Sequence, residues 1–355
     1  MKLVLRCLCL CILVIAVVQV CFYGNQTFLR SMICLTSQND KNTIDLLQRR
    51  IGSKSQTYKE THKESVGELQ VIRNTYNKTN TNFEARKAYV LSEDSASVQN
   101  GHICQDTNVS ITVLILISSA PLNMVNRNVL RKTWLTHCTG NTGNVRYAFL
   151  LGQSEYNADI VHENYMTRDI IMGDFNDTYH KLTLKTLYGY QWATKYCSTA
   201  KFVMKCDDDS FVNIPGLLNR IQNITDLLQA GIGGFIIRKP IPVRDPHDRK
   251  WFVSFQTYQH ESYPPYCLGG PGYITSVDVV CKIVNVSKEV PYFPFEDVYI
   301  GMCIHKLNYS VYNIQGVFNR MYSRNPCHFK NKKFICAHRI PLTKMEYVWT
   351  TPCLN

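Results

Sequence analysis

The sequence lacks the short motifs that define several large classes of nucleotide-binding and metal-binding proteins. No GxGxxG or GxxxxGK pattern follows the first predicted strand, which argues against a dinucleotide-binding domain and against a P-loop. There is no CxxC pattern of the kind that binds zinc. No internal repeat is visible, so a single folded domain or two are expected rather than a repeat array.

Acidic residues are few relative to basic ones. The 355-residue chain has 27 Asp and Glu against 39 Lys and Arg, which gives a formal net charge of +12. Such an excess is found in proteins that bind nucleic acid, an anionic membrane or a phosphorylated small ligand. The compartment in which the chain resides decides among these partners.

The amino-terminal segment predicts a membrane anchor. Residues 1–6 carry Lys2 and Arg6, and residues 7–23 are apolar apart from Gln19. About 17 residues at ~1.5 Å each span roughly 25 Å, which suits a thin early secretory membrane. A cleaved signal peptide is the alternative, but no small-x-small pair follows the apolar run. The positive charges that precede the run place residues 1–6 in the cytosol and the rest of the chain in the lumen.

Glycosylation sequons and cysteines agree with a lumenal location. The seven Asn-x-Ser/Thr sequons are Asn25, Asn77, Asn108, Asn176, Asn223, Asn285 and Asn308. Four of the 15 cysteines lie in residues 7–23, and the others predict disulfides in an oxidising lumen. Because the lumenal cysteines are odd in number, at least one stays free or pairs with another chain. Nucleic acid is not an expected partner.

Residues 24–106 lack sustained apolar periodicity and are rich in Ser, Thr, Asn, Gln and Lys. Such a segment cannot bury enough apolar surface to offset the entropy lost on ordering. We therefore predict a mostly disordered, glycosylated stem. Residues 107–355 are predicted to form the folded domain.

Strands and helices alternate in the first half of the folded domain. Apolar runs predict strands at 110–119, 145–152, 169–175 and 202–206, and later at 233–237 and 251–254. Apolar periodicity predicts helices at 126–137, 182–197, 215–224, 277–286 and 298–307. The alternation predicts an α/β fold with a parallel sheet and right-handed crossovers, as in a Rossmann-like nucleotide-binding half.

Three adjacent acids, Asp207, Asp208 and Asp209, follow the fourth predicted strand. They would lie at the carboxyl end of that strand, where ligands gather in open α/β sheets. Burying three carboxylates is costly unless a cation or hydrogen bonds compensate, so a hard divalent metal is a natural partner. A solvated acidic turn is the alternative. An EF-hand loop is excluded because its sixth and twelfth positions hold Val212 and Leu218.

A second pair of acids, Glu296 and Asp297, begins a predicted helix about ninety residues later. The helix dipole favours acids at this end, which is a sufficient structural reason for them. One of the two could instead act as a general base, since a carboxylate near an acceptor hydroxyl can take its proton as a bond forms. Neighbouring side chains on a helix project about 100° apart, so only one of the pair can face a substrate.

The segment 263–276, with the sequence YPPYCLGGPGYITS, is dense in proline, glycine and aromatic residues. Its aromatic rings could lie against sugar faces, and its glycines would allow close approach of the backbone. An ordinary turn-rich connection is an equally open interpretation.

From about Ile111 the chain resembles the β-1,3-glycosyltransferases of glycosyltransferase family 31. The blocks that carry the resemblance stand in the family's order: RNVLRKTW (127–134), FLLG (149–152), DIIMGDFNDTYHKLTLKT (169–186), KCDDDSFVN (205–213), KWFVS (250–254), YPPYCLGGPGYITS (263–276), FEDVYIGMC (295–303) and AHRIPLTKMEYVW (337–349). So many blocks in the correct order make the resemblance highly specific.

The resemblance implies a GT-A-type nucleotide-sugar transferase fold in a type II Golgi membrane protein. The donor would be a UDP-sugar, with UDP-galactose favoured and N-acetylglucosamine or N-acetylgalactosamine as alternative sugars. Mn²⁺ or another divalent metal would bridge the donor phosphates. The acceptor would be a glycan on lipid or protein, joined through a β-1,3 linkage. A catalytically inactive lumenal glycan-binding protein is the alternative from a different class.

The resemblance also assigns roles to single residues. The implied metal ligands are Asp207, Asp209 and His338. The implied donor-binding residues are Arg127, Arg131, Lys205, Asp207 and Asp208. The two arginines are four residues apart and share one helix edge, so a buried ion pair with Asp208 or another acid is an equally open role. The implied acceptor-binding residues are Trp251, Tyr266, Gly269 and Gly270.

The implied mechanism is a single in-line displacement. Asp297, with Glu296 beside it, would remove the proton from the acceptor's 3-hydroxyl, and that oxygen would attack the anomeric carbon from the face opposite UDP. An α-linked donor would therefore give a β-linked product. The sequence leaves disulfide pairing and a homodimer open.

Overall fold

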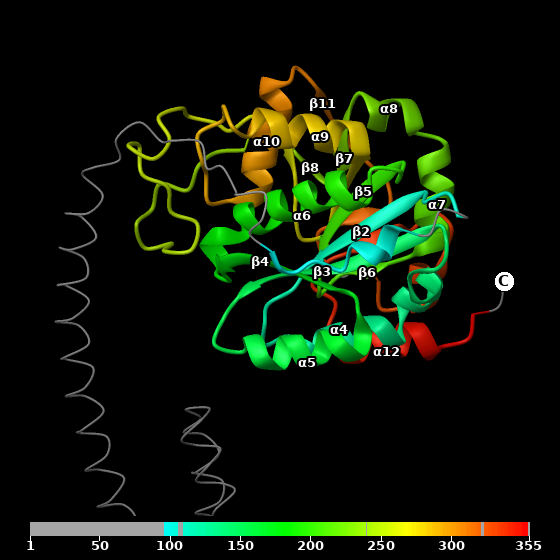
Figure 1. The fold of residues 1–355 in the computed structure, drawn as a ribbon. Helices are drawn as coiled ribbons and strands as arrows, with labels where there is room; N and C mark the ends of the chain where they lie inside the picture. The colour runs from blue at the N-terminus through cyan, green and yellow to red at the C-terminus, as the bar shows by residue number, and fades with distance from the viewer. Residues whose placement is uncertain (1–95, 106–108, 239, 321–322, 354–355) are drawn as a thin grey trace, which may run out of the picture. The chain divides into compact units, whose positions relative to one another are not determined.

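The structure is a computed structural model that describes residues 96–105, 109–238, 240–320 and 323–353 (Figure 1). The predicted cytosolic tail, membrane anchor and most of the predicted stem, residues 1–95, lie outside the described residues. No helix in the described part of the chain is both long and apolar enough to cross a membrane.

An eight-stranded mixed sheet forms the centre of the domain, in the order β1-β4-β3-β2-β5-β10-β7-β11. Its strands are β1 (Ala96–Val98), β2 (Val113–Ser118), β3 (Val145–Gln153), β4 (Ile170–Asn176), β5 (Phe202–Asp207), β7 (Gly231–Gly234), β10 (Tyr273–Ser276) and β11 (Ser310–Asn313). Strands β4, β3, β2 and β5 are parallel neighbours, which confirms the parallel half predicted from the sequence. Strand β10 runs antiparallel to both β5 and β7, so the whole sheet is mixed.

Two smaller sheets flank the central one. A three-stranded sheet has the order β12-β13-β6, and a two-stranded sheet pairs β8 with β9. The bounds of these strands are β6 (Phe211–Val212), β8 (Ile236–Ile237), β9 (Tyr266–Cys267), β12 (Val317–Phe318) and β13 (Cys336–Ala337). The three-stranded sheet brings the carboxyl-terminal part of the chain against the residues that follow β5.

Helices connect the strands. The α-helices are α4 (Met124–Lys132), α5 (Asn157–Thr167), α6 (Leu182–Tyr196), α7 (Ile214–Gln222), α8 (Thr225–Gln229), α9 (Val277–Val286), α10 (Glu296–Lys306), α11 (Cys327–Lys330) and α12 (Leu342–Thr350). The 3-10 helices are η2 (Gly101–Cys104), η3 (Trp134–Asn141) and η4 (Tyr179–Lys181). Side-chain caps fix two of the starts, because Asn213 accepts a hydrogen bond from the amide of Gly216 before α7 and Ser276 accepts one from Val279 before α9.

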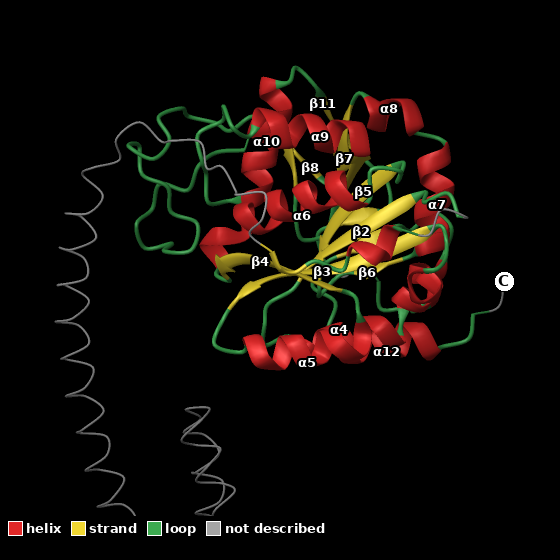
Figure 2. Cartoon of the chain, viewed as in Figure 1, coloured by secondary structure: helices red, strands yellow, loops and turns green. Residues whose placement is uncertain are grey.

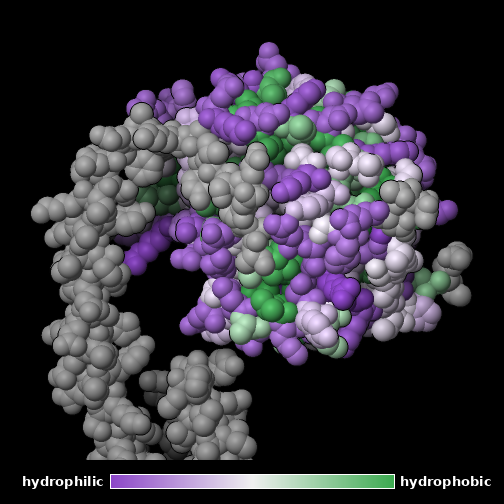
Figure 3. Space-filling view, in the orientation of Figure 1, coloured by the Kyte–Doolittle hydropathy of each residue, from purple (hydrophilic) through white to green (hydrophobic). Residues whose placement is uncertain are grey.

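The helices cover both faces of the central sheet (Figure 2). On β2, Leu114 and Leu116 pack with the buried residues of α6, α9 and α10, whereas Val113, Ile115 and Ile117 pack with those of α4, α7 and α12. The alternation of side chains along a strand therefore divides the core into two clusters. Hydrophilic side chains predominate on the face of the molecule seen in Figure 3.

The register of the parallel strands sets where the acidic triplet lies. Strand β2 pairs with β5 so that Ser118 stands opposite Asp207, and the amide of Asp208 donates to the carbonyl of Ser118. The two strands thus end side by side, as expected for the carboxyl edge of a parallel sheet. The loop after β2 and the acids after β5 consequently share one edge.

Some predicted elements differ from the structure. The helix expected at 126–137 ends at Lys132, and η3 follows it. The strand expected at 251–254 is wrong, because these residues lie in a loop that makes only one isolated bridge, between Val243 and Phe252. No neighbouring strand is available there to form a ladder in the described structure.

Residues before the predicted domain boundary at 107 take part in the fold. Strand β1 pairs antiparallel with β4 at the edge of the central sheet, and a disulfide joins Cys104 of η2 to Cys197. A second disulfide joins Cys327 to Cys353. Both bridges agree with the expected oxidising compartment. Among the unpaired cysteines of the described residues, Cys281 is exposed and the others are buried.

Four predicted glycosylation sites lie in the described part of the chain. They are Asn176, Asn223, Asn285 and Asn308, and each is exposed. The sites Asn25, Asn77 and Asn108 lie outside the described residues. Exposure makes the four sites accessible, and their modification stays a prediction.

Candidate active site

A group of two carboxylates and one imidazole lies at the end of β5. Strand β13 pairs antiparallel with β6, which brings His338 beside the acids that precede β6. His338 Nε2 lies 3.0 Å from Asp209 Oδ1 and 3.8 Å from Asp207 Oδ2. The amide of Ile340 also donates to the carbonyl of Asp209. Hydrogen bonds on both sides of β13 therefore hold His338 in place.

The three side chains fit a divalent metal. One ligand atom from each of Asp207, Asp209 and His338 can be chosen so that all lie within 4.8 Å of one another. Oδ1 of Asp209 is buried and has no hydrogen bond of good geometry among the described residues, although Nε2 of His338 lies 3.0 Å away, so a bound cation would supply the partner that a buried oxygen requires. Carboxylate oxygens suit Mn²⁺, and imidazole nitrogen is a ligand for many transition metals.

Asp208, the middle acid of the triplet, points away from this group. Its Oδ2 accepts hydrogen bonds from Ser119 Oγ at 2.7 Å and from Asn123 Nδ2 at 2.9 Å, and its Oδ1 accepts one from Asn126 Nδ2 at 3.5 Å. Burial raises the pKa of Asp208, and the hydrogen bonds from Ser119 and Asn123 oppose that effect. Asp208 therefore anchors the acidic loop to the start of α4.

Lys205 connects the two groups of acids. Its Nζ lies 2.8 Å from Asp207 Oδ1 and 3.3 Å from Glu296 Oε2, and it also donates to the carbonyl of Gly269. Burial acts to lower the pKa of Lys205, but Asp207 and Glu296 outweigh it and raise that pKa. Lys205, which the resemblance assigned to the donor, is thus engaged by protein groups.

Glu296 and Asp297 occupy the first turn of α10 with different surroundings. Glu296 is buried, and its carboxylate is held by the hydroxyl of Tyr273 and by Lys205. Asp297 is partly exposed, and its carboxylate accepts hydrogen bonds from the amides of Val298 at 2.9 Å and Gly269 at 3.5 Å. Of the two acids, Asp297 is the one whose carboxylate accepts no hydrogen bond from a side chain among the described residues.

The electrostatic setting of Asp297 suits a base. Burial, and after it the charge of Glu296, raises the pKa of Asp297 to about 7. A carboxylate with a pKa near neutrality combines a useful ionised fraction with an appreciable affinity for a proton. The two acids therefore differ in their surroundings, because side chains hold the carboxylate of Glu296 and backbone amides hold that of Asp297.

Two consecutive glycines bring the loop between β9 and β10 against both groups of acids. A Cβ atom on Gly269 would lie 2.3 Å from Oε2 of Glu296, and one on Gly270 would lie 2.2 Å from Cε1 of His338. The carbonyl of Gly270 also accepts hydrogen bonds from the amide of Asp207 and from Ser210 Oγ. Glycine at these two positions thus allows the loop to approach Glu296 and His338 closely.

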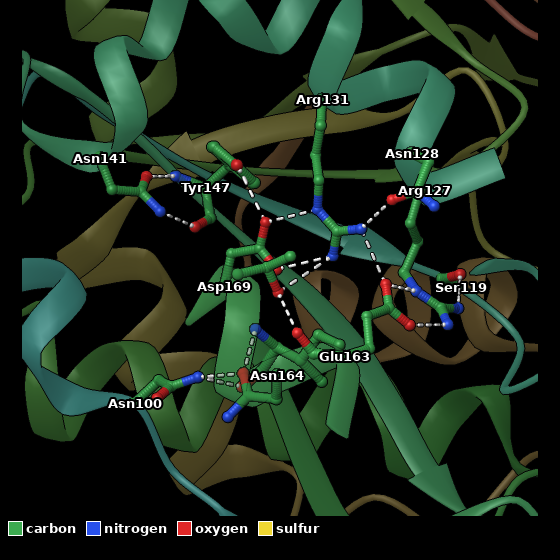
Figure 4. Close-up of polar contacts among 12 residues, drawn as sticks. Asn100, Ser119, Arg127, Asn128, Arg131, Asn141, Tyr147, Glu163, Asn164 and Asp169 are labelled. Carbon is green, nitrogen blue, oxygen red and sulfur yellow. Dashed lines mark hydrogen bonds and ion pairs between the residues drawn. The ribbon is translucent and has the colours of Figure 1, made fainter. Parts of the chain in front are cut away.

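Arg127 and Arg131 form ion pairs with the buried acids Glu163 and Asp169 (Figure 4). The five N–H groups of Arg127 donate to Glu163 twice, to Ser119 Oγ and to the carbonyls of Ala120 and Pro121. Because a guanidinium has five donors, none is left for a diphosphate. The geometry supports the ion-pair interpretation of the arginines, with acids other than Asp208 as their partners.

Aromatic side chains line one side of the approach to Asp297. The ring of Trp251 lies 5.7 Å from that of Phe295, which directly precedes Glu296, and 5.7 Å from that of Tyr179. Trp251 is 40% exposed, so one part of its ring is available to a ligand. Burial raises the pKa of Tyr179, and the negative charges of Asp297 and Asp207 raise it further.

Tyr266 lies on β9, beside α10. A Cβ atom on Gly301 of α10 would lie 2.6 Å from Cβ of Tyr266, so strand and helix are in close contact. Burial raises the pKa of Tyr266, and the charge of Asp297 adds to the effect.

Several residues of the site were not identified from the sequence. Ser119 and Asn123 hold Asp208, Tyr273 holds Glu296, and Tyr179 extends the aromatic surface. Ser119 and Tyr179 follow the ends of parallel strands, and that position is the signal that could have identified them. No comparable signal exists for Tyr273, which is one of 21 tyrosines.

Comparisons with known proteins show which proteins this chain resembles. The profile of the Galactosyltransferase family matches residues 125–315. The beta-1,3-galactosyltransferase 5 of Pan troglodytes is 34% identical over 244 residues, a match that covers 66% of this chain and 80% of the relative. The beta-1,3-galactosyltransferase 1 of Mus musculus is 33% identical over 241 residues, covering 67% and 72%. A solved galactosyltransferase in complex with donor and acceptor sugar analogues matches 68% of this chain and 97% of its own, at 14% identity and a TM-score of 0.36.

Proposed function

This chain belongs to the galactosyltransferase family, and we propose that it transfers galactose from UDP-galactose to the 3-hydroxyl of a glycan acceptor with a β linkage. The enzyme class follows from the family. The identity of the nucleotide, UDP, and of the acceptor group, the 3-hydroxyl, is part of the proposal. The two relatives reported above are named beta-1,3-galactosyltransferases, which supports a β-1,3 linkage and galactose as the sugar.

One observation supports this function above the others. The carboxylate and imidazole group formed by Asp207, Asp209 and His338 is joined through Lys205 to the helix start that carries Asp297. A glycosyl transfer from a sugar nucleotide requires two separate functions, neutralisation of the diphosphate and removal of a proton from the acceptor. In this proposal Asp207, Asp209 and His338 serve the first function and Asp297 serves the second.

Each residue then has a distinct task. Asp297 accepts the proton of the acceptor hydroxyl, for which its pKa of about 7 is suited. Glu296 stays in its hydrogen bonds to Tyr273 and Lys205 and fixes the first turn of α10. Asp207, Asp209 and His338 would hold Mn²⁺ or a similar divalent ion. The ion would supply positive charge to the leaving diphosphate.

The aromatic surface is the proposed acceptor site. Trp251 and Tyr179 present rings near Asp297, and Lys250 Nζ lies 4.4 Å from the centre of the Tyr179 ring. Sugar rings carry an apolar face that packs on aromatic side chains, so these rings suit a glycan. Tyr266 and the backbone of Gly269 and Gly270 complete the proposed acceptor surface.

The wider setting of the enzyme is also part of the proposal. We expect a GT-A-type domain on a single-pass type II anchor in the Golgi membrane, with the catalytic domain in the lumen. The acceptor would be a lipid-linked or protein-linked glycan. The two disulfides and the exposed sequons support a secretory location. The proposal also includes a homodimer, which a measurement of the oligomeric state of the purified chain would test.

A donor and acceptor panel tests the function. The purified full-length chain in detergent would be incubated with UDP-galactose, UDP-N-acetylglucosamine or UDP-N-acetylgalactosamine, each with and without Mn²⁺, and with a set of glycan acceptors. We expect Mn²⁺-dependent galactose transfer. Transfer of another sugar would replace the donor assignment. Binding of glycans without transfer or hydrolysis of any donor would identify an inactive glycan-binding protein.

A further inference from the structure

We propose that the buried chain Glu163–Arg127–Ser119–Asp208 positions the acidic loop for metal binding. Arg127 and Ser119 are positioning residues in this view, because they act through Asp208, which is not one of the proposed ligands Asp207, Asp209 and His338. The inference rests on the proposed function, since it assigns a further role at the same metal site.

The hydrogen bonds run outward from Arg127, to Glu163 on one side and through Ser119 to Asp208 on the other. Arg127 donates to both oxygens of Glu163, at 2.9 and 2.6 Å, and to Ser119 Oγ at 2.9 Å (Figure 4). A serine hydroxyl has one proton, and accepting from Arg127 leaves that proton to be donated. Ser119 Oγ lies 2.7 Å from Asp208 Oδ2, far closer than its other acceptor at 3.4 Å. The arginine therefore directs the serine proton at Asp208.

A second arginine keeps Glu163 in place. Arg131 donates to Oε1 of Glu163 at 2.8 Å and to both oxygens of Asp169, each at 2.8 Å. Tyr147 donates its hydroxyl proton to Asp169 as well. All these groups are buried or nearly so, and low polarity strengthens hydrogen bonds between charged groups. The network thus links α4, α5 and the start of β4 into one rigid support.

The hydrogen-bond network reaches the proposed metal ligands Asp207 and Asp209 through the backbone of Asp208, which lies between them. Asp208 lies between Asp207 and Asp209, and its side chain and backbone are both bound to the end of β2. Asp207 ends β5, and Asp208 and Asp209 form the turn that follows it, closed by a hydrogen bond from the amide of Ser210 to the carbonyl of Asp207. With Asp208 held toward Ser119 in the middle of this short turn, its two neighbours keep their oxygens 3.8 and 3.0 Å from Nε2 of His338.

A neighbouring serine provides a matched control. Ser118 is buried like Ser119, but its Oγ has no hydrogen-bond partner among the described residues. Replacing either serine with alanine removes one buried hydroxyl from the same strand end. Only the change at residue 119 breaks the chain to Asp208.

The test measures direct binding of Mn²⁺ to the purified full-length chain in detergent. Binding is detected by electron paramagnetic resonance, as the loss of the signal of free Mn²⁺. We expect Ser119→Ala to weaken Mn²⁺ binding about tenfold, the change expected when one hydrogen bond to a charged group is lost. We expect Ser118→Ala to bind as the unaltered chain does. Arg127→Lys should weaken binding similarly, and the Ser119→Ala, Arg127→Lys double variant should add little, because both changes break one chain.

Three results separate the interpretations. Equal Mn²⁺ binding by the two serine variants would overturn the inference while leaving the proposed function intact. An unaltered chain that binds no Mn²⁺ would overturn the metal site and, with it, the inference. If Ser119→Ala does not fold, Asn123→Ala removes another donor to the same oxygen from a partly exposed position. That variant should weaken Mn²⁺ binding several-fold, and unchanged binding would count against the inference.

Discussion

Nζ of Lys205 lies 3.3 Å from Oε2 of Glu296, a residue 91 positions further along the chain. The same nitrogen lies 2.8 Å from Oδ1 of Asp207. One buried lysine thus joins the group formed by Asp207, Asp209 and His338 to the start of α10, which carries Glu296 and Asp297. Replacing Lys205 would therefore disturb both Asp207 and Glu296.

Lys205→Met is expected to destabilise the fold strongly. The change leaves Asp207 and Glu296 without their shared cation, and breaking a buried ion pair costs about 3–5 kcal/mol. Thermal or denaturant unfolding of the purified chain measures the effect. Lys201→Met, at an exposed position four residues earlier, is the matched control and should change stability little. Equal stability of the two variants would show that Lys205 does not hold the site together.

Asp297→Asn should lower the rate of transfer by about 10²- to 10⁴-fold, the usual contribution of a general base. Asparagine keeps the size of the side chain but cannot accept the proton. Binding of Mn²⁺ and UDP should persist, because the metal group is unchanged. A transfer rate near that of the unaltered enzyme would assign the proton to Glu296 or to water.

Transfer should increase with pH through about 7. Asp297 must be ionised to act as a base, and its pKa is raised to about 7 by burial and by Glu296. Below that value kcat/KM should fall about tenfold per pH unit, as expected for a single ionisation. A pH series at saturating Mn²⁺ measures this, and a flat profile between pH 5.5 and 8 would contradict the assignment.

The raised pKa also has a consequence for stability. Asp297 binds its proton more tightly in the folded chain than in the unfolded one, so the folded state loses stability as pH increases from about 4 to about 7. Asp297→Asn should remove that loss, so the variant should melt at a higher temperature than the unaltered chain at pH 8. An equal or lower melting temperature at pH 8 would indicate that the carboxylate is not destabilised in the fold.

Alanine at the two glycines should give different defects. Gly270→Ala places a methyl group against the His338 ring, so Mn²⁺ binding should weaken. Gly269→Ala places a methyl group against Glu296, so the transfer rate should fall while Mn²⁺ binding is retained. Each variant serves as the control for the other, and paired measurements of Mn²⁺ affinity and kcat distinguish them. Identical defects would indicate general disruption of the loop.

The sequence predicts the parts of the site that depend on local pattern. The apolar run before Asp207 predicted a strand end, and the periodicity after Asp297 predicted a helix start, and both are confirmed. The four-residue spacing of Arg127 and Arg131 predicted a shared edge, and both arginines contact Glu163. These inferences need only the geometry of one strand or one helix.

Contacts between distant segments could not be predicted in this way. The bond between Lys205 and Glu296 depends on how β5 and α10 pack, which no local pattern records. His338 was selected from ten histidines only through the family resemblance, and the pairing of β13 with β6 explains its position. The strand expected at 251–254 was wrong because a β-prone sequence forms a strand only where a partner strand lies beside it.

The most direct test of the central claim is the structure of the product formed from UDP-galactose and Mn²⁺. Nuclear magnetic resonance of the purified product gives both the anomeric configuration and the acceptor position that carries the galactose. We predict a β-linked galactose on the 3-hydroxyl of the acceptor. An α linkage, a different hydroxyl, or no galactose transfer to any acceptor would contradict the account.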